Sequence, residues 1–323
     1  MSAPRVGLIG ARRARRGLGP YVARDLLAAG AEVPCFLGTS DQTVERARVE
    51  LESTVGLSSR GYVDLEEMLS RERLDALAVL SPADTHEAYL RAAIRAGLHV
   101  LCEKPLVWGG EGLGKRAGDL VAAFASRGLL LAENCQWPYV LPAYRDLHPD
   151  LAPGPPASFS MQLSPEVRGR EMVGESMSHP LSLLQTVASG GDAHLEQVRV
   201  SAPGAGSGEP DHLEFRGRYR AGGAEIGFEV ALVRTTVTPK PAALALDGRW
   251  AHREVDLPSY AIHLNSGVRR VKVVDPLTSR VRDFVEELGR VLGGRAPGRF
   301  EEIAVRMAML EEVRLATERG MPR

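Results

Sequence analysis

In the first 133 residues, short apolar runs alternate with stretches in which apolar residues recur every three or four positions. Short apolar runs are typical of strands buried in a sheet, and the three-to-four spacing is typical of helices with one buried face. The pattern predicts strands at 5–9, 32–37, 76–80, 99–102 and 129–132, and helices at 21–29, 43–51 and 85–96, with further helices starting at residue 64 and after residue 105. Because parallel strands need a crossover and each helix supplies one, this half is predicted to be a doubly wound parallel sheet of the α/β class. An α/β sheet that binds no dinucleotide is the alternative at this point.

From residue 134 onward the pattern changes. Prolines at positions 149, 153, 155 and 156 interrupt the chain, and strand patterns dominate after them. In Ala224–Val233, apolar residues alternate with Glu225 and Glu229, which predicts a strand with one apolar face. Residues 202–210 are rich in glycine and proline and predict a surface loop, while 280–292 and 300–318 predict amphipathic helices. We therefore expect two domains, 1–133 and 134–323, which a chain of 323 residues is long enough to form.

The composition is that of an ordinary globular protein, with 44% hydrophobic residues, 25% charged residues and a formal net charge of -1. It gives no bias toward nucleic acid or membranes, so we expect neither as a partner. The apolar runs are too short to span a bilayer and the first residues enter a strand at once, which predicts a cytoplasmic protein. Three widely spaced cysteines, Cys35, Cys102 and Cys135, predict reduced, buried thiols. The eight histidines show no metal-ligand spacing, so no metal site is expected.

Between the first predicted strand and helix, residues 10–19 read Gly-Ala-Arg-Arg-Ala-Arg-Arg-Gly-Leu-Gly. A dinucleotide-binding turn reads Gly-x-Gly-x-x-Gly, which lets the backbone approach a pyrophosphate at the start of the helix. We take Gly10 as the first glycine and Gly17 as the last, with Arg12 in place of the second, in a loop about two residues longer than the pattern. Arg12 and Arg13 are therefore expected to contact the cofactor, and a loop of merely solvated arginines is the alternative.

The end of the second predicted strand indicates which cofactor is preferred. An NAD site generally has Asp or Glu there for the ribose 2'-hydroxyl, whereas this chain has Gly38, Thr39 and Ser40. The hydroxyls of Thr39 and Ser40 can bond a 2'-phosphate without repelling it, so we predict NADP(H) over NAD(H). Asp41, one residue further on, keeps NAD(H) as the alternative.

Lys104 follows the buried run 98–102, within Glu103-Lys104-Pro105. It is one of four lysines in a chain with thirty-six arginines. The carboxyl end of a parallel strand is where open α/β sheets bind ligands, and a lysine there can donate or accept a proton, which an arginine cannot. A lysine that merely pairs with a nearby carboxylate is the alternative.

These segments resemble the Gfo/Idh/MocA family, named after glucose-fructose oxidoreductase, inositol dehydrogenase and rhizopine catabolism. The resemblance is carried by the Ser-Pro-Ala-Asp-Thr-His stretch at 81–86, the Gly-Leu-His-Val-Leu-Cys-Glu-Lys-Pro stretch at 97–105, and Asn134. It implies an N-terminal Rossmann domain, a C-terminal domain with an open, mostly antiparallel sheet, and an active site between them. It also implies that Lys104 reaches the nicotinamide ribose and the substrate. The other cofactor-binding residues that it implies are Ser81, Pro82, His86, Glu103 and Asn134.

The same resemblance points to the stretch Gly174–Leu181 in the second half. Family members have an aspartate followed four residues later by a catalytic His or Tyr, so His179 takes the acid/base position and Glu175 replaces the aspartate. Residues four apart share one face of a helix, which would aim both into the cleft. Because Pro180 is tolerated only in a first turn, we expect Glu175 at or just before the helix start.

The expected activity is hydride transfer between NADP(H) and a carbonyl or hydroxyl carbon of a sugar, cyclitol or related metabolite. His179 would exchange the substrate proton, Lys104 would stabilise the developing charge, and Glu175 would position the pair. A redox-neutral elimination or hydrolysis with transient NAD(P) oxidation, or a non-enzymatic NAD(P)-binding sensor, are the alternatives. The resemblance also implies a homodimer or homotetramer assembled through the open sheet. Substrate contacts are expected from Gln136, Trp137, Arg168, Arg170, Tyr260 and His263, with the two arginines as candidates for an anionic group.

Overall fold

The computed structural model describes residues 2–12, 17–204, 208–298 and 300–320. The chain forms two compact units. The first unit comprises Met1–Gly110, Arg116–Asn134 and Leu277–Ile303, and the second comprises Glu111–Lys115, Cys135–Pro276 and Ala304–Arg323.

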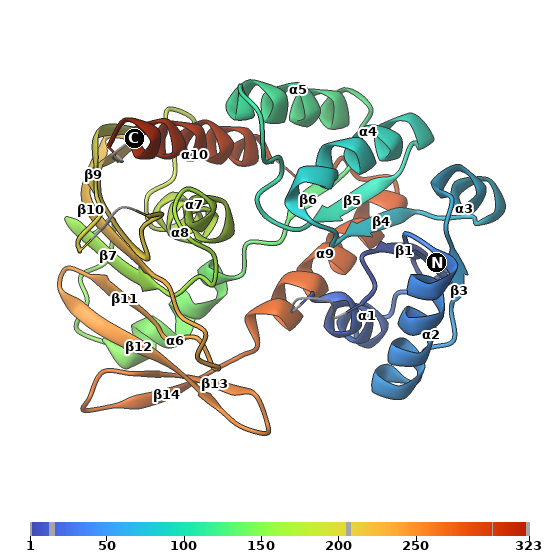
Figure 1. Cartoon of the computed structure of the whole chain (residues 1–323), viewed down its shortest axis with the longest axis horizontal. Coiled ribbons are helices and arrows are strands. Elements are labelled where there is room, and N and C mark those ends of the chain that lie inside the picture. The colour runs from blue at the N-terminus through green and yellow to red at the C-terminus, as the bar shows by residue number, and fades with distance from the viewer. Residues whose placement is uncertain (1, 13–16, 205–207, 299, 321–323) are drawn as a thin grey trace. The chain divides into compact units, whose positions relative to one another are not determined.

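The first unit contains a six-stranded, wholly parallel sheet with the order β3-β2-β1-β4-β5-β6 (Figure 1). The strand order reverses between β1 and β4, as in a doubly wound sheet, so the predicted α/β architecture is confirmed. The strands are β1 (Val6–Ile9), β2 (Cys35–Leu37), β3 (Arg60–Tyr62), β4 (Ala76–Val79), β5 (His99–Cys102) and β6 (Leu131–Glu133).

Helices cover this sheet and follow the predicted alternation. They are α1 (Gly19–Ala28), α2 (Asp41–Val55), α3 (Leu65–Arg71), the 3-10 turn η2 (Ala83–Thr85), α4 (His86–Ala96), α5 (Leu113–Ser126) and α9 (Pro276–Leu292). The predicted cap of α3 is present, since the Asp64 carboxylate accepts from the Glu67 N-H at 2.7 Å. Gly97 ends α4 in the left-handed conformation that glycine favours.

Helix α9 packs with the first sheet, although it comes from the segment that the sequence analysis assigned to the second domain. Its apolar stripe joins the core formed by α1, α2 and the strands of the first unit. That stripe consists of Leu277, Val281, Phe284, Val285 and Leu288. The apolar spacing of 280–292 predicts the helix and its buried face, but it carries no information about which sheet the face covers.

The second unit contains an eight-stranded sheet with the order β14-β13-β12-β11-β7-β10-β9-β8. Only the β7–β10 pair is parallel, so the expected mostly antiparallel sheet is confirmed. Its strands are β7 (Ser158–Leu163), β8 (His194–Ser201), β9 (His212–Ala221), β10 (Ala224–Val233), β11 (Ala242–Leu246), β12 (Arg249–Asp256), β13 (Ala261–Asn265) and β14 (Arg270–Val273). Its helices are η3 (Trp137–Val140), α6 (Leu141–Leu147), α7 (Glu171–Ser176), α8 (Ser178–Val187) and α10 (Glu301–Gly320).

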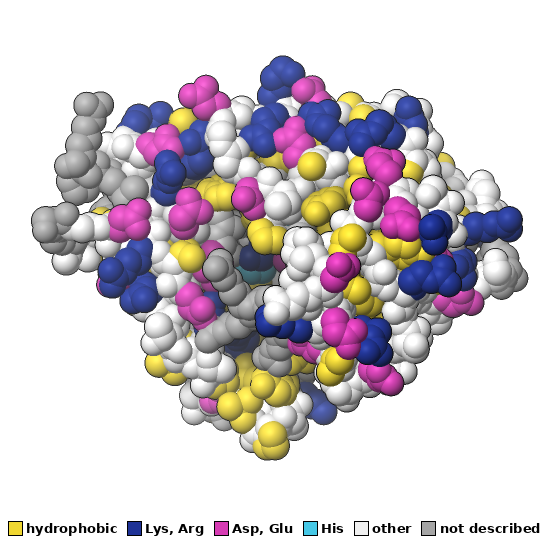
Figure 2. All heavy atoms as spheres, turned by 45° about the vertical axis from the view of Figure 1, so that its right-hand side comes forward, with side chains coloured by type: hydrophobic (Ala, Val, Ile, Leu, Met, Phe, Trp, Pro, Cys, Tyr) yellow, Lys and Arg dark blue, Asp and Glu magenta, His cyan; other side chains and the backbone are white. Residues whose placement is uncertain are grey.

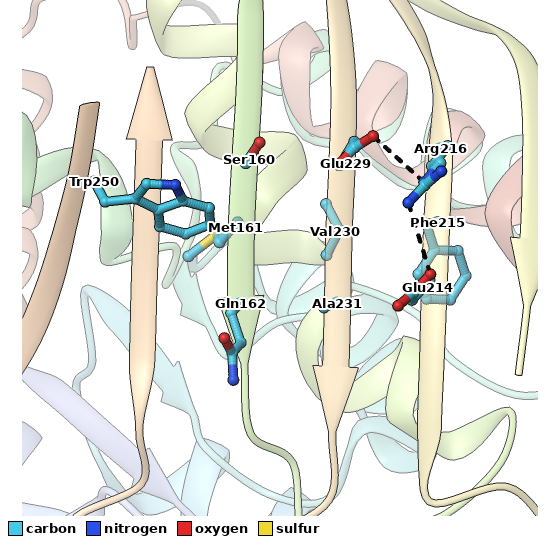
Figure 3. A pocket seen from close by; sticks show the side chains of 10 residues that line it. All are labelled: Ser160, Met161, Gln162, Glu214, Phe215, Arg216, Glu229, Val230, Ala231 and Trp250. Atoms are coloured by element: carbon cyan, nitrogen blue, oxygen red, sulfur yellow. Dashed lines mark ion pairs between the residues drawn. The ribbon is translucent and has the colours of Figure 1, made fainter. Parts of the chain in front are cut away.

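One face of this sheet is apolar and the other is polar. In β10, which has the predicted bounds, Ile226, Phe228, Val230 and Leu232 are all at most 2% exposed. The opposite face carries the side chains of Ser160, Gln162, Glu229, Arg216 and Trp250 (Figure 3). There Arg216 lies 3.4 Å from Glu229 and 3.9 Å from Glu214. This polar face is called the open face below.

Other global expectations can be compared with the structure. Cys35, Cys102 and Cys135 are free and buried, as predicted. In the part of the chain that the structure describes, no helix is both long and apolar enough to cross a membrane. Figure 2 shows acidic and basic side chains interspersed over the face that it presents, in keeping with the small net charge.

Candidate cofactor pocket and candidate catalytic residues

Two glycines allow the close backbone approaches around the loop after β1. Gly10 has φ +88°, and a Cβ there would lie 2.7 Å from the carbonyl oxygen of Leu80. A Cβ on Gly19, the first residue of α1, would lie 2.3 Å from the carbonyl oxygen of Ala11. A close approach of α1 to the loop after β1 therefore occurs at Gly19. Gly17, the predicted last glycine of the pattern, lines the pocket described below, and its place in the pattern stays a prediction. Arg13 lies outside the described residues.

The amino end of α1 is suited to an anion. Its N-cap residue, Leu18, makes no side-chain capping bond, and its first turn contains no acidic residue. The first N-H groups of a helix have no partner within the helix and carry a partial positive charge. A pyrophosphate could therefore accept hydrogen bonds there, as the glycine pattern predicts.

A pocket of about 630 Å³ lies at this loop, beside the reversal of strand order between β1 and β4. Ligands bind at such a reversal in open α/β sheets. The lining comes from the β1–α1 loop, the end of β2, the turn after β4 and the residues after β5. It includes Gly10, Arg12, Gly17, Thr39, Thr43, Ser81, Pro82, His86, Tyr89, Glu103 and Lys104.

At the β2 end of the pocket, Thr39 and Thr43 supply hydroxyl groups. The Thr43 Oγ1 accepts from the N-H groups of Thr39 and Ser40, each at 2.9 Å, and donates to the Ser40 carbonyl. The Ser40 Oγ in turn accepts from the Thr43 N-H at 3.3 Å and so caps α2. Ser40 is thus used for capping, whereas Thr43, which the sequence analysis missed, lines the pocket. The signal was the Ser-x-x-Thr spacing of a capping box.

Arg12 is the cation at this end of the pocket. Its side chain is 30% exposed and its Nε lies 4.0 Å from the Glu50 carboxylate. The Nε is buried and has no hydrogen-bond partner among the described residues. Of the described residues lining the pocket, Glu103 is the only acidic one. The Arg12 end therefore favours an anionic ligand group.

His86 joins two turns of the pocket wall. Its ring is 1% exposed, with Nδ1 2.9 Å from the Pro105 carbonyl oxygen and Nε2 2.8 Å from the Ser81 carbonyl oxygen. Burial lowers the pKa of His86, against the opposing effect of these two carbonyls. Ser81 and Thr85 hold the same turn through their hydroxyls at 2.7 Å. His86 therefore links the turn after β4 to the residue that follows Lys104.

The residues beside Lys104 are also held. The Asn134 side-chain amide donates to the Glu103 carboxylate, and the Glu133 carboxylate accepts from the Leu106 N-H at 2.9 Å. Burial raises the pKa of Glu103, although the Lys104 charge opposes the shift. The Lys104–Pro105 peptide bond is cis. Lys104 thus lines the pocket between two fixed neighbours.

In the second unit, His179 and Glu175 lie on consecutive short helices rather than on one. Glu175 is near the end of α7, and His179 is the second residue of α8, with Pro180 in the first turn as expected. The Glu175 carboxylate lies 2.6 Å from the Lys240 Nζ and accepts from the Glu166 N-H. Glu175 is therefore positioned by Lys240, which the sequence analysis had not singled out. The pairing of Lys104 with His179 stays a prediction.

Trp137 lies beside His179, with ring centroids 6.4 Å apart. Trp137 also contacts Arg253, whose guanidinium lies 5.6 Å from the indole centroid. Trp137 is one of the predicted substrate residues, whereas Arg253 is not. Its signal is visible in retrospect, because Arg253 shares the apolar phase of β12 with Ala251 and Val255.

The remaining substrate candidates lie elsewhere or are already paired. Arg168 is 2.7 Å from Asp211, and Arg170 is 3.5 Å from Glu171, so both guanidinium groups face carboxylates. His263 lies opposite Glu254 in the β12–β13 register and is 3.3 Å from Asp256, on the face of the sheet away from Arg253. Tyr260 is 53% exposed in the turn before β13. Gln136 directly precedes Trp137 and is the N-cap residue of η3.

Comparison with known proteins finds a family match for the N-terminal part of the chain. Residues 4–134 match the family model GFO_IDH_MocA, described as an oxidoreductase family with an NAD-binding Rossmann fold. Among curated proteins, the inositol 2-dehydrogenase of Azotobacter vinelandii is 34% identical over 98 residues, which are 30% of this chain and 28% of that enzyme. The match thus spans less than a third of this relative's length.

Solved structures extend the fold similarity over nearly the whole chain. The UDP-N-acetylglucosamine 3-dehydrogenase of Acidithiobacillus ferrooxidans gives a TM-score of 0.69 at 21% identity, covering 98% of each chain. A 3-ketoreductase of Actinomadura kijaniata, in complex with TDP-benzene and NADP, gives a TM-score of 0.67 at 21% identity, covering 96% of each chain. At these identities the similarity establishes the fold.

Proposed function

Because this chain carries the NAD-binding domain of the Gfo/Idh/MocA oxidoreductases, we propose that it transfers a hydride between NADP(H) and a carbonyl or hydroxyl carbon of a sugar, cyclitol or related small metabolite. The observation that carries the proposal is the pocket of the first unit. It has Arg12, Thr39 and Thr43 at one end and Lys104 among its remaining lining residues. Arg12, Thr39 and Thr43 could bind a phosphorylated ribose, and Lys104 could donate a hydrogen bond to the reacting oxygen of the substrate.

The residues present fit a dinucleotide. The N-H groups at the start of α1 would bind the pyrophosphate, and Gly10 leaves the backbone accessible there. Arg12 and the Thr39 hydroxyl would bind the 2'-phosphate, which supports NADP(H) over NAD(H). Ser81 and Pro82 would line the nicotinamide end, as in the family that the sequence resembles.

The cofactor, when bound, accepts or supplies the hydride. The proton that accompanies the hydride is exchanged with the substrate oxygen by His179. Lys104 donates a hydrogen bond to the same oxygen and stabilises its developing negative charge. Glu175, which is held by Lys240, positions His179 and tunes its proton affinity.

The proposal is tested by single-turnover assays. The protein would be mixed with NADPH or NADH and a panel of keto-sugars and keto-cyclitols, and in the reverse direction with NADP⁺ or NAD⁺ and the corresponding alcohols, while absorbance at about 340 nm is followed. We expect a stoichiometric change with at least one compound and tighter binding of NADPH than of NADH. Tighter binding of NADH than of NADPH would contradict the proposed cofactor preference. The absence of an absorbance change with every compound would contradict the proposed activity.

We also propose that the protein is a homodimer or homotetramer assembled through the open face. That face is a broad surface of the sheet, on which Trp250 is 42% exposed beside Ser160 and Gln162 (Figure 3). Exposed aromatic residues are enriched in subunit interfaces. Sedimentation of the wild type and of Trp250→Asp should show a shift toward monomer in the variant, whereas a monomeric wild type would exclude the assembly.

We propose, finally, that the protein works in the cytoplasm. Its three cysteines are free and buried, which is typical of proteins from a reducing compartment. Its proposed cofactor is also an intracellular metabolite.

A further inference from the structure

Arg253 points to the face of the second sheet that is otherwise apolar. It lies between Ala251 and Val255 in the same phase of β12, and Leu264 is opposite it on β13. Ala251 and Leu264 are fully buried. Arginine is rarely placed in such surroundings unless its charge is matched by a partner.

No such partner is present among the described residues, where the guanidinium makes no ion pair within 4.0 Å. Its Nη2 donates to the Lys240 carbonyl oxygen at 2.7 Å, and its Nε is buried without a hydrogen bond. The carboxylates of Glu175 and Glu166 face the Lys240 ammonium instead, at 2.6 and 3.8 Å. Burial lowers the pKa of Arg253, yet a guanidinium stays charged in proteins. The structure therefore holds a half-buried positive charge whose Nε has no hydrogen-bond partner among the described residues.

This charge shares an aromatic neighbour, Trp137, with the candidate catalytic histidine. Trp137 contacts both residues, with its ring 5.6 Å from the Arg253 guanidinium and 6.4 Å from the His179 ring. The indole makes a cation–π contact with the guanidinium. A planar guanidinium is the best side chain for binding a carboxylate or phosphate through two parallel hydrogen bonds.

We propose that Arg253 binds an anionic substituent of the substrate, a carboxylate or a phosphate, while His179 exchanges the proton at the reacting carbon's oxygen. This rests on the proposed function, and it narrows the substrate class to acidic sugars or sugar phosphates, including nucleotide sugars. Arg168 and Arg170, the arginines that the sequence suggested for this role, are each occupied by a carboxylate. Arg253, which shares the neighbour Trp137 with His179, faces no carboxylate within 4.0 Å among the described residues.

The test compares substrates of one ring type and different charge. Glucose, glucuronate and UDP-glucose would be assayed with NADP⁺ against the wild type, Arg253→Gln and Arg253→Lys. Arg168→Gln, which removes a positive charge already paired at the surface, is the matched control. We expect Arg253→Gln to raise KM for the anionic compound that is turned over by about 10- to 100-fold, with kcat and the use of glucose little changed. Arg253→Lys should show a smaller rise, and Arg168→Gln none.

A binding measurement keeps the inference testable without turnover. Isothermal titration of the protein saturated with NADPH, which occupies the proposed pyrophosphate site at α1, with glucuronate, inorganic pyrophosphate and glucose should show that the wild type binds at least one anion more tightly than glucose, and that only the Arg253 variants lose this binding. Anion binding without turnover of any compound would contradict the proposed function and support the inference. Wild-type preference for glucose, or equal anion binding in wild type and Arg253→Gln, would overturn the inference whether or not the enzyme is active. The midpoint of thermal unfolding identifies a variant that fails to fold. In that case, the comparison of anion and glucose binding by the wild type tests the inference.

Discussion

Arg12 is the residue on which the proposed preference for NADP(H) depends most. It lines the pocket near Thr39 and Thr43, and its Nε lacks a hydrogen-bond partner among the described residues. Replacing Arg12 with Ala should weaken NADPH binding by about 10- to 100-fold, because a charge-assisted hydrogen bond contributes about 1.5 to 3 kcal/mol. NADH binding should change by less than about threefold, since NADH lacks the phosphate. Fluorescence titration measures both, and an equal loss for both cofactors would contradict the assignment.

Lys104 and His179 are the residues on which the proposed chemistry depends. Lys104→Met and His179→Ala should each lower kcat by about a hundredfold or more, the usual effect of losing a general acid or base. NADPH affinity should be nearly unchanged in His179→Ala. Lys272→Met, which removes an exposed lysine on β14, is the control and should keep full activity. Undiminished turnover in both Lys104→Met and His179→Ala would exclude these roles.

At the scale of elements, the start of α2 serves both folding and the proposed binding. Thr43 holds the N-H groups of Thr39 and Ser40, so Thr43→Val should destabilise the fold by about 1 kcal/mol and also weaken NADPH binding several-fold. Asp64→Ala is the matched control, because it removes the cap of α3, which does not line the pocket. It should cost about the same stability and leave binding unchanged. Urea unfolding and NADPH titration of both variants check this, and a binding loss in both would indicate a general effect of destabilisation.

The sequence predicts the elements well and their partners less well. The periodicity locates β5 and β10 at their observed bounds and predicts the buried apolar face of α9. It does not predict the sheet that α9 covers, because apolar spacing specifies a buried face and no partner. For the same reason it misses the neighbours that decide the roles of Glu175 and Arg253, since Lys240 and Trp137 are distant in the chain. Glu103-Lys104-Pro105 is found because its cue is local, a strand with a proline three residues beyond its end.

At the scale of the whole molecule, buried histidines link stability to pH. Burial lowers the pKa of His86 and His99 below the ordinary value of about 6.5. As the pH falls through about 6.5 toward the lower folded values, the unfolded chain takes up protons that the folded chain does not, so the free energy of unfolding falls. His86→Gln should reduce this slope by at most about 1.4 kcal/mol per pH unit. Urea unfolding between pH 5.5 and 7.5 measures the slopes, and identical slopes in wild type and His86→Gln would contradict the account.

The return of α9 to the first sheet has a consequence for how the protein is made. Ribosomes release a chain from its N-terminus, and domains usually fold as soon as they have emerged. Here the core around Val6 and Phe36 lacks Val281 and Phe284 until most of the chain has been synthesised. The core of the first sheet therefore stays incomplete, with apolar surface exposed, until the strands of the second sheet have been translated. A fragment ending near residue 134 should therefore aggregate in the cell, whereas a circular permutant that begins at residue 277 and continues into residue 2 would give this unit its own helix from the start.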